Sequence, residues 1–297
     1  MSTIQLERFS YIEPGTIQEA SKALKQQNAQ GNCACILAGG IDLIPRIRSG
    51  SIKTKFIVNI ASISGLSDIT YCEGKGFTFG AMAKLHELDT NKDLLKHYPA
   101  VQKAIHQITS VQSKYMGTAV GNLCLATPAS DVAPALMAYD AELTISGDGT
   151  ERKVMLCDFY LDYRKVDLAP DEFVTKVFIP DPKSNSGDAF LNRVRTHADI
   201  AKITVAVVVQ NDNGICTHAR IAIGAAAPIV LRAISAEKIL VGQIITSELQ
   251  EKAAEAVLCD ISPITDFRST KEYRLEMAQV LTSRALHKAF ETKGGNE

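Results

Sequence analysis

A segment rich in Pro, Ser and Gly divides the sequence into two parts that carry different patterns. It runs Ile179-Pro-Asp-Pro-Lys-Ser-Asn-Ser-Gly187, a composition typical of a connection between folded units. The chain has 297 residues, which is long enough for two or three domains. We therefore predict one domain over residues 1–180, built from subdomains 1–60 and 61–180, and a second domain over residues 188–297.

The first part has the pattern of a small α/β unit followed by hairpins and short helices. Thr16 and Glu19 form a capping box, which predicts a helix start. The stretch 117–131 is rich in small residues and does not fit a core helix. The expected elements are a helix from residue 17, strands at 35–38 and 56–60, a hairpin over 69–80, and helices from 101 and at 132–138, with a hairpin over 141–155.

The second part has the pattern of a long hairpin followed by helices. An apolar strand at 203–210 leads into the turn Asn211-Asp-Asn-Gly214 and a returning strand at 215–223. Three helical segments follow at 235–241, 247–258 and 270–292. The whole pattern predicts an α+β fold, with a C-terminal antiparallel sheet packed against helices.

Composition excludes several classes of function. The net charge is −1, from 32 basic and 33 acidic residues, so we expect no nucleic-acid partner. The longest apolar run, 203–209, is too short for a membrane span, and residues 1–8 lack the layout of a secretory signal. We therefore expect a cytoplasmic protein. The seven cysteines contain no C-x-x-C pair and the six histidines no metal spacing, so no metal site is expected.

The segment Leu37-Ala38-Gly39-Gly40-Ile41-Asp42 is the first candidate for ligand binding. Two glycines after a strand let the backbone approach a ligand, and their N–H groups suit a phosphate. A helix beginning at Leu43 would present its positive end there. Asp42 occupies the N-cap position, where its carboxylate is expected to accept from the helix N–H groups. The alternative is a plain Gly-Gly turn without a ligand.

Two further segments carry candidate ligand-binding residues. The first is Thr118-Ala119-Val120-Gly121-Asn122, with Asp131 further along the chain. Its hydroxyls, small residues and amide precede a helix, which suits a ligand with phosphate and polyol groups. The alternative is a turn-rich loop in which Asp131 caps the helix. Lys202 begins the long strand, where it is either a cation near a ligand or an ordinary surface lysine. No acid, base or nucleophile motif stands out, which indicates that a cofactor carries the reactivity.

In this order and at these distances, the motifs resemble the FAD-binding medium subunit of the molybdenum hydroxylases, the family of xanthine dehydrogenases, aerobic carbon monoxide dehydrogenases and 4-hydroxybenzoyl-CoA reductases. The stretch 38–42 is similar to the family's A-G-G-T-D loop, and 118–122 is similar to its T-I-G-G-N loop. Asp199-Ile-Ala-Lys202 matches the D-I-A-K of xanthine dehydrogenases. The resemblance covers nearly the whole chain, and it extends to Gly224-Ala-Ala-Ala-Pro228 with Arg232-Ala233.

The resemblance implies a fold and a binding site. The N-terminal part would be a PCMH-like FAD-binding domain of two α/β subdomains. Residues 37–42 and 118–122 would wrap the FAD pyrophosphate with backbone N–H groups. Asp131 would hydrogen-bond the ribityl chain, and Lys202 would lie near the flavin. A rival flavoprotein group tethers FAD through a histidine in the first loop, but residues 39–43 contain none, so we expect non-covalent FAD.

The resemblance also implies partners. The flavin would take electrons from two [2Fe-2S] clusters in a small subunit, which receive them from molybdopterin in a large subunit, as a dimer of heterotrimers. It would pass them to NAD, oxygen, a quinone or a ferredoxin. Neither metal centre is expected in this chain, and the cysteine-rich insert that some members carry after the position of Cys124 is absent. Two alternatives remain: an assembly subunit that has lost flavin, and a stand-alone FAD oxidoreductase.

Two residues depart from the family's loops. Ile41 replaces the usual Thr and removes a hydroxyl that would reach a phosphate, so backbone donors must suffice. Val120 stands where the first glycine of the G-G pair is expected. A β-branched residue resists positive φ, so Val120 has an ordinary φ or the loop is displaced.

Overall fold

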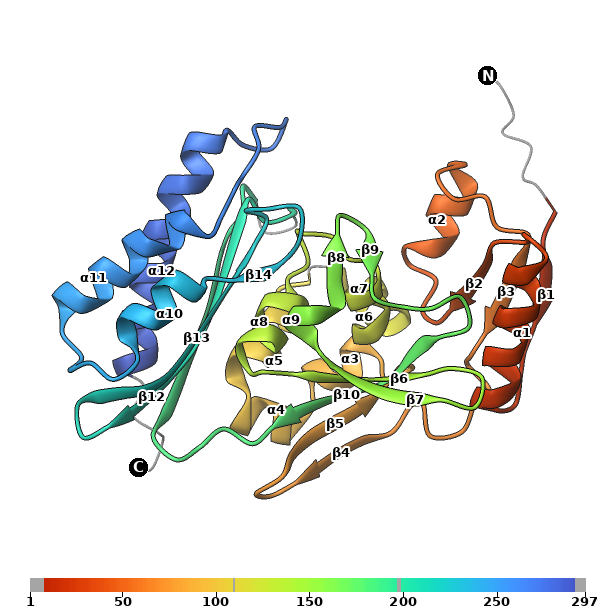
Figure 1. Ribbon diagram of the computed structural model, residues 1–297, viewed down its shortest axis with the longest axis horizontal. Helices are drawn as coiled ribbons and strands as arrows, with labels where there is room; N and C mark the ends of the chain where they lie inside the picture. The colour runs from red at the N-terminus through yellow and green to blue at the C-terminus, as the bar shows by residue number, and fades with distance from the viewer. Residues whose placement is uncertain (1–7, 109, 197–198, 292–297) are drawn as a thin grey trace.

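A three-stranded parallel sheet with one covering helix opens the fold (Figure 1). The computed structural model describes residues 8–108, 110–196 and 199–291. The strands are β1 (Ser10–Ile12), β3 (Phe56–Asn59) and β2 (Ala34–Leu37), in that order. The helix α1 (Ile17–Ala29) starts as predicted, because the side chain of Thr16 accepts from the Glu19 N–H at 3.1 Å. A short helix, α2 (Leu43–Arg48), follows β2.

A five-stranded antiparallel sheet forms the centre of the molecule, and short helices cover it (Figure 1). Its order is β4 (Ile69–Cys72), β5 (Gly76–Gly80), β10 (Phe173–Pro180), β6 (Glu142–Ser146) and β7 (Glu151–Met155). Both predicted hairpins are present. The remaining central elements are α3 (Leu85–Asp89), α4 (Lys92–His97), α5 (Pro99–His106), α6 (Val111–Met116), α7 (Ala119–Cys124), α8 (Val132–Ala138), α9 (Leu156–Phe159), β8 (Tyr160–Asp162) and β9 (Lys165–Val166).

The prediction that the stretch 117–131 is not part of a core helix is wrong, because the structure contains α7 there. Thr118 caps this helix by accepting from the Gly121 N–H at 3.0 Å. Ala119, Val120 and Leu123 are buried on its inner side. Small side chains let such a short helix pack closely against its neighbours. This tertiary packing outweighs the weak helix propensity of the local sequence.

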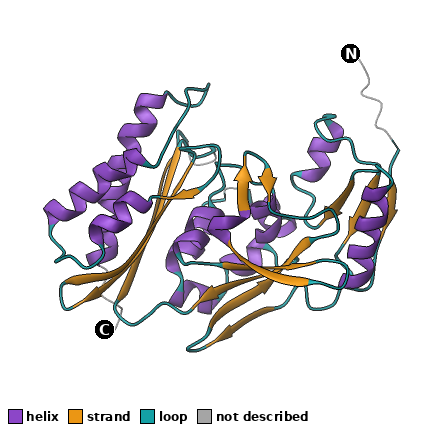
Figure 2. Ribbon diagram, viewed as in Figure 1, coloured by secondary structure: helices purple, strands orange, loops and turns teal. Residues whose placement is uncertain are grey.

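The C-terminal sheet lies between two groups of helices (Figure 2). Its strands are β11 (Ser186–Arg193), β12 (Ile203–Asp212), β13 (Ile215–Gly224) and β14 (Leu231–Arg232). The predicted long hairpin is β12–β13. One face contacts α10 (Ile234–Leu240) and α12 (Lys271–Glu291), and α11 (Ser247–Ala256) and a short 3-10 helix (Val257–Cys259) pack behind them. The predicted helix at 270–292 is α12; residue 292 lies outside the described residues.

Strand β12 is buried on both faces, which explains its continuous apolar run. Val205 and Val207 belong to the core shared with the C-terminal helices. Ala206 and Val208 belong to the other core, which extends through α5 and α8 into the central sheet. Side chains alternate across a strand, so this one strand contributes to both cores. The α+β fold class is confirmed.

The connection between the central and C-terminal sheets is shorter than the predicted linker, because residues 179–180 lie in β10 and residues 186–187 lie in β11. The connection is held in place at Asp181, whose carboxylate accepts from the Tyr98 hydroxyl at 3.0 Å and from the Gly74 N–H at 2.6 Å. The domain division remains a prediction. None of the helices in the described ranges combines the length and the apolar character that a bilayer crossing requires.

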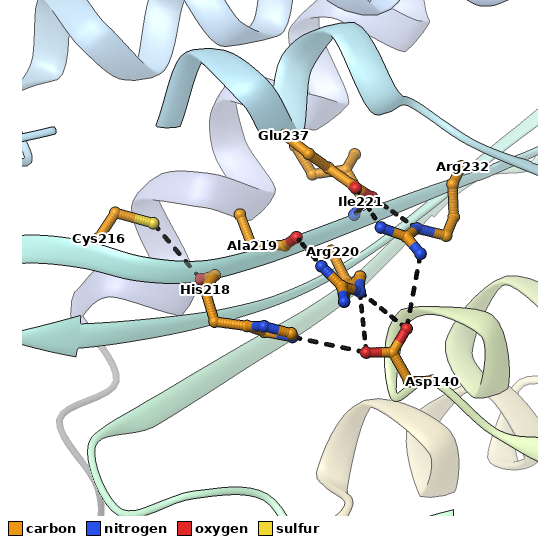
Figure 3. A network of polar contacts seen from close by, with 8 residues as sticks. All are labelled: Asp140, Cys216, His218, Ala219, Arg220, Ile221, Arg232 and Glu237. Atoms are coloured by element: carbon orange, nitrogen blue, oxygen red, sulfur yellow. Dashed lines mark hydrogen bonds and ion pairs between the residues drawn. The ribbon is translucent and has the colours of Figure 1, made fainter. Parts of the chain in front are cut away.

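An ion-pair network joins the end of α8 to the C-terminal sheet (Figure 3). Asp140 follows α8 and accepts from the Arg220 side chain on β13 at 2.7 and 2.8 Å. His218 and Arg232 each lie 3.6 Å from the same carboxylate. Glu237 on α10 pairs with Arg232 and accepts from the Ile221 N–H at 2.9 Å. The network fixes how the sheet sits against α8.

Candidate cofactor-binding site

A cleft of about 580 Å³ lies between the N-terminal sheet and the central helices. Its walls come from three parts of the chain that are far apart in sequence. One wall is α1, β2 and the segment 38–42; another is the region of α7 and the start of α8; the third is the stretch 168–174 that leads into β10. In Figure 1, β2 and α2 lie on one side of this region and α6 and α7 on the other.

The two predicted ligand-binding segments meet directly in this cleft. A Cβ atom on Gly39 would lie 2.4 Å from the Met116 carbonyl oxygen and 2.8 Å from the Gly117 Cα atom. Only glycine fits there, because the two backbones already touch. Gly40 has a φ of +72°, a conformation that glycine adopts readily. The structure therefore brings residues 38–42 against residues 117–122.

The first segment has open backbone donors. Within the described part of the chain, the N–H groups of Gly39, Gly40 and Ile41 donate no hydrogen bond. Unpaired N–H groups gathered at a concave surface form a site for anionic oxygen atoms. The second segment is the capped start of α7. Val120 lies in this helix and is absent from the positive-φ residues, so its departure from the glycine pattern produces no backbone strain.

Asp131 lines the cleft and carries an unpartnered oxygen atom. Its Oδ1 is buried without a hydrogen-bond partner among the described residues, and burial raises the pKa of Asp131 to about 6. The alternative in which Asp131 caps α8 is wrong, because its side chain makes no cap bond. Ser130 caps α8 instead, accepting from the Ala133 N–H at 3.0 Å and donating to the Asn122 side chain at 2.5 Å.

Asp42 lines the cleft but does not cap α2, contrary to the sequence prediction. Its φ of −98° and ψ of −42° are already helical, whereas a capping residue needs an extended backbone to bring its side chain onto the first-turn N–H groups. Burial raises the pKa of Asp42, and the charges of Arg46 and Arg164 partly offset that rise.

Three predicted site residues do not line the cleft. Leu37 ends β2, and Ala119 is buried inside α7. Lys202 lies in the C-terminal part, with its Nζ 5.4 Å from the centroid of the Tyr273 ring. The other predicted residues all line the cleft: Ala38, Gly39, Gly40, Ile41, Asp42, Thr118, Val120, Gly121, Asn122 and Asp131.

Two charged residues of the cleft were not predicted from the sequence, Arg46 and Glu172. Arg46 lines the cleft from α2, one helical turn after Asp42. The i, i+4 spacing from a candidate loop residue was the available signal for Arg46. Glu172 belongs to the wall at 168–174, which carries no motif and was also not predicted.

Comparison with known proteins matches both parts of the chain to described families. Residues 7–182 match the FAD binding domain in molybdopterin dehydrogenase. Residues 188–289 match the CO dehydrogenase flavoprotein C-terminal domain. The first match alone covers more than half of the chain.

Individual relatives align over almost their full length. The xanthine dehydrogenase FAD-binding subunit of Escherichia coli O157:H7 is 30% identical over 288 residues, covering 96% of this chain and 97% of that protein. The carbon monoxide dehydrogenase medium chain of Afipia carboxidovorans is 30% identical over 281 residues, covering 95% and 96%.

Solved structures give the same result. A chain of carbon monoxide dehydrogenase from Hydrogenophaga pseudoflava superposes with a TM-score of 0.91 at 28% identity, covering 97% of this chain and 99% of that one. A chain of quinoline 2-oxidoreductase from Pseudomonas putida 86 superposes with a TM-score of 0.88 at 26% identity, covering 98% and 100%. With a glycine-lined cleft in a matching fold, this chain belongs to the family of FAD-binding medium subunits of molybdenum hydroxylase complexes.

Proposed function

We propose that this chain passes electrons between [2Fe-2S] clusters of a partner subunit and an external acceptor, through non-covalently bound FAD. The complex would be a molybdopterin-dependent hydroxylase or dehydrogenase of the xanthine dehydrogenase type. The observation that carries the proposal is the cleft that the segment 39–41, with its open N–H groups, shares with the capped start of α7. Membership of an oxidoreductase family supports the electron-transfer role.

The residues of the cleft fit FAD. The open N–H groups of Gly39, Gly40 and Ile41 are donors for pyrophosphate oxygen atoms. Asp131 offers a buried oxygen without a partner, which accepts from a hydroxyl such as those of a ribityl chain. A buried polar atom without a partner is costly, so a hydroxyl donor at Asp131 stabilises the folded protein.

Bound FAD would supply the redox chemistry, which protein side chains do not provide. The residues of this chain would bind FAD and orient it. The contact of Gly39 with Met116 and Gly117 holds the two wall segments in one arrangement. Thr118 holds the first turn of α7 in place. The segment 39–41 and the first turn of α7 are therefore in position before a ligand binds, which lowers the entropic cost of binding.

Two thiols in the cleft bear on whether the flavin is tethered. Cys35 and Cys124 both line it. Burial raises the pKa of the Cys35 thiol, and it raises the pKa of Cys124 to about 12. Since only the thiolate is nucleophilic, neither side chain is prepared to form a bond with a flavin. Residues 39–43 contain no histidine. Both facts support non-covalent binding.

The partners follow from the same proposal. A large subunit would hold molybdopterin and a small subunit the [2Fe-2S] clusters, as a dimer of heterotrimers, with NAD or another acceptor taking the electrons. Among the described residues of this chain there is no group of three or more His, Cys, Asp or Glu side chains placed to hold a metal ion.

The first test is the visible absorption spectrum of the purified chain, recorded before and after denaturation and removal of the protein. We expect flavin bands, with free FAD in the supernatant. FAD that stays on the polypeptide would show that the non-covalent assignment is wrong. Absence of flavin, even after FAD is added to the folded chain, would favour the assembly subunit.

The second test is the composition of the complex isolated through an affinity tag on this chain. We expect iron and molybdenum to be recovered with it, together with two further subunits. A chain that is recovered alone and oxidises a substrate by itself would instead be a stand-alone FAD oxidoreductase, and the proposed role would fail.

A further inference from the structure

Arg46 is a cation of the cleft that forms no ion pair within the described part of the chain. Its side chain lines the cavity from α2, and its Nε is buried without a hydrogen-bond partner. A partly buried guanidinium that lacks an acceptor is costly. The side chain is therefore placed for an anion that the chain itself does not provide.

The surroundings of Arg46 define where that anion would lie. The Arg46 N–H donates to the Asp42 carbonyl at 3.2 Å, so the two residues share one face of α2. The charge of Arg46 acts on the Cys35 thiol in β2 as well as on Asp42. The guanidinium therefore acts on groups of both β2 and the segment 38–42, which line the same cleft.

Arg46 lines the cleft from α2, whereas Asp131 lines it from the start of α8. Cys35 is next to Ala34, whose N–H donates to the Asn28 side chain at 2.8 Å. The same Asn28 side chain donates to the Pro170 carbonyl at 2.6 Å. These contacts join α1, β2 and the stretch 168–174 into one wall, and the charge of Arg46 acts on Cys35 of that wall, whereas Asp131 lies at the start of α8.

We propose that Arg46 binds the phosphate on the adenylate side of the FAD pyrophosphate. The inference rests on the proposed function, which places FAD in the cleft with its ribityl chain at Asp131 and therefore its adenylate half away from Asp131. The planar guanidinium presents two parallel N–H donors to phosphate oxygen atoms, which a lysine does not. The same positive charge offsets the repulsion between a phosphate and Asp42.

The test measures ligand affinity of the flavin-free full-length chain for three probes: FAD, ADP and riboflavin. Arg46→Gln removes the charge and keeps a chain of similar shape. We expect its dissociation constants for FAD and ADP to rise by about 10- to 100-fold, the usual range for a hydrogen bond to a charged group. Riboflavin, which has no phosphate, should bind as it does to the unmodified chain.

Arg48→Gln is the matched control. Arg48 lies on the same helix, is exposed and does not line the cleft. We expect its affinity for all three probes to stay within about twofold, since an exposed charge contributes little. Arg46→Lys should give an intermediate loss for FAD and ADP, because it keeps the charge and loses the planar pair of donors.

The outcomes separate the two levels of the proposal. If the unmodified chain binds no FAD, the proposed function fails. If the unmodified chain binds FAD and Arg46→Gln binds FAD and ADP equally well, the assignment of Arg46 fails alone. If Arg46→Gln and Arg46→Lys weaken riboflavin as much as FAD, the residue shapes the cleft and does not bind phosphate. Circular dichroism of each variant shows whether it is folded.

Discussion

At the scale of single residues, Gly39 is the position where two backbone segments touch. A side chain there would meet the Met116 carbonyl oxygen and the Gly117 Cα atom, both of which belong to the backbone. Backbone atoms cannot move aside as the end of a flexible side chain can. The constraint on this residue is therefore steric contact between the walls of the cleft.

Gly39→Ala should separate those walls. We expect a loss of about 1–3 kcal/mol in the free energy of unfolding, as for an overpacked core position. We also expect a loss of FAD affinity of about tenfold or more, because the open N–H groups move out of register with α7. Denaturant unfolding and FAD titration measure the two effects.

Gly15→Ala is the control for this prediction. A Cβ atom on Gly15 would have only the Glu19 carboxylate near it, at 3.6 Å. Both quantities should stay close to those of the unmodified chain. Unchanged FAD affinity in Gly39→Ala would contradict the placement of FAD between the two segments.

Asp131 makes the stability of the flavin-free protein depend on pH. Its pKa is about 6 in the folded chain, whereas an unfolded aspartate titrates near 4. Between these values the folded protein holds a proton that the unfolded chain has lost. Stability therefore falls as the pH rises from about 4 to about 6, and the full loss is present above that range.

Asp131→Asn should remove this dependence. We expect the variant to gain stability over the unmodified chain as the pH rises from about 5 to about 8, by on the order of 1 kcal/mol. Denaturant unfolding of both proteins at the two pH values gives the difference. A difference that is the same at both pH values would show that Asp131 is not the group responsible.

The sequence identified the residues of the cleft better than it identified what they do. Glycines, hydroxyls and their order in the chain predict Ala38–Asp42 and, apart from Ala119, the stretch 118–122. The capping roles assigned to Asp42, and as an alternative to Asp131, were wrong, because capping depends on the backbone angles of the capping residue. Those angles are set by packing, which no local motif records.

At the scale of elements, α7 shows that tertiary packing can form a helix where the local sequence does not predict one. Its six residues include Gly121, which disfavours a helix interior, and the sequence shows no helical period there. The cap at Thr118 and the buried positions on its inner side compensate. Long elements carried stronger signals, a continuous apolar run in β12 and a helical apolar face in α12, and both were predicted.

Thr118→Val tests whether the cap of α7 serves the cleft. Val keeps the shape of Thr and removes the oxygen that accepts from the Gly121 N–H. We expect a loss of about 1 kcal/mol in stability, together with weaker FAD binding, because the first turn of α7 forms one wall of the cleft. Unfolding and FAD titration report on the two effects separately.

The matched control is Thr246→Val, at the cap of α11. Thr246 accepts from the Leu249 N–H at 3.1 Å in the same way, but α11 lies far along the chain and does not line the cleft. This variant should lose similar stability and keep full FAD affinity. Equal FAD affinity in both variants would mean that the cap has no part in binding.

At the scale of the whole molecule, α8 connects the two parts of the chain. All seven of its residues are buried, and it contacts both β12 and β13 of the C-terminal sheet. Ala206, Val208 and Ala222 of that sheet share a core with the central helices. The C-terminal sheet therefore buries a face of α8 that the N-terminal part of the chain leaves uncovered.

A fragment of residues 1–185 should consequently fail to reach the stability of the full chain. Without β12 and β13, one apolar side of α8 is exposed to water, at a cost of about 25 cal/mol per Å² of uncovered apolar surface. We expect the fragment to bind an apolar fluorescent dye, and the full chain to unfold in one transition by two independent probes. A fragment that unfolds cooperatively and binds no dye would contradict this.

The ion pairs between Asp140 and β13 also limit how this chain could be recombined with a relative. A hybrid that joins residues 1–185 to the second half of another member keeps Asp140 but inherits a foreign strand in place of β13. Wherever that half lacks cations at the positions of Arg220 and Arg232, the carboxylate loses both of its arginine partners. Crossovers at this junction should therefore tolerate only donors that carry the complementary charge.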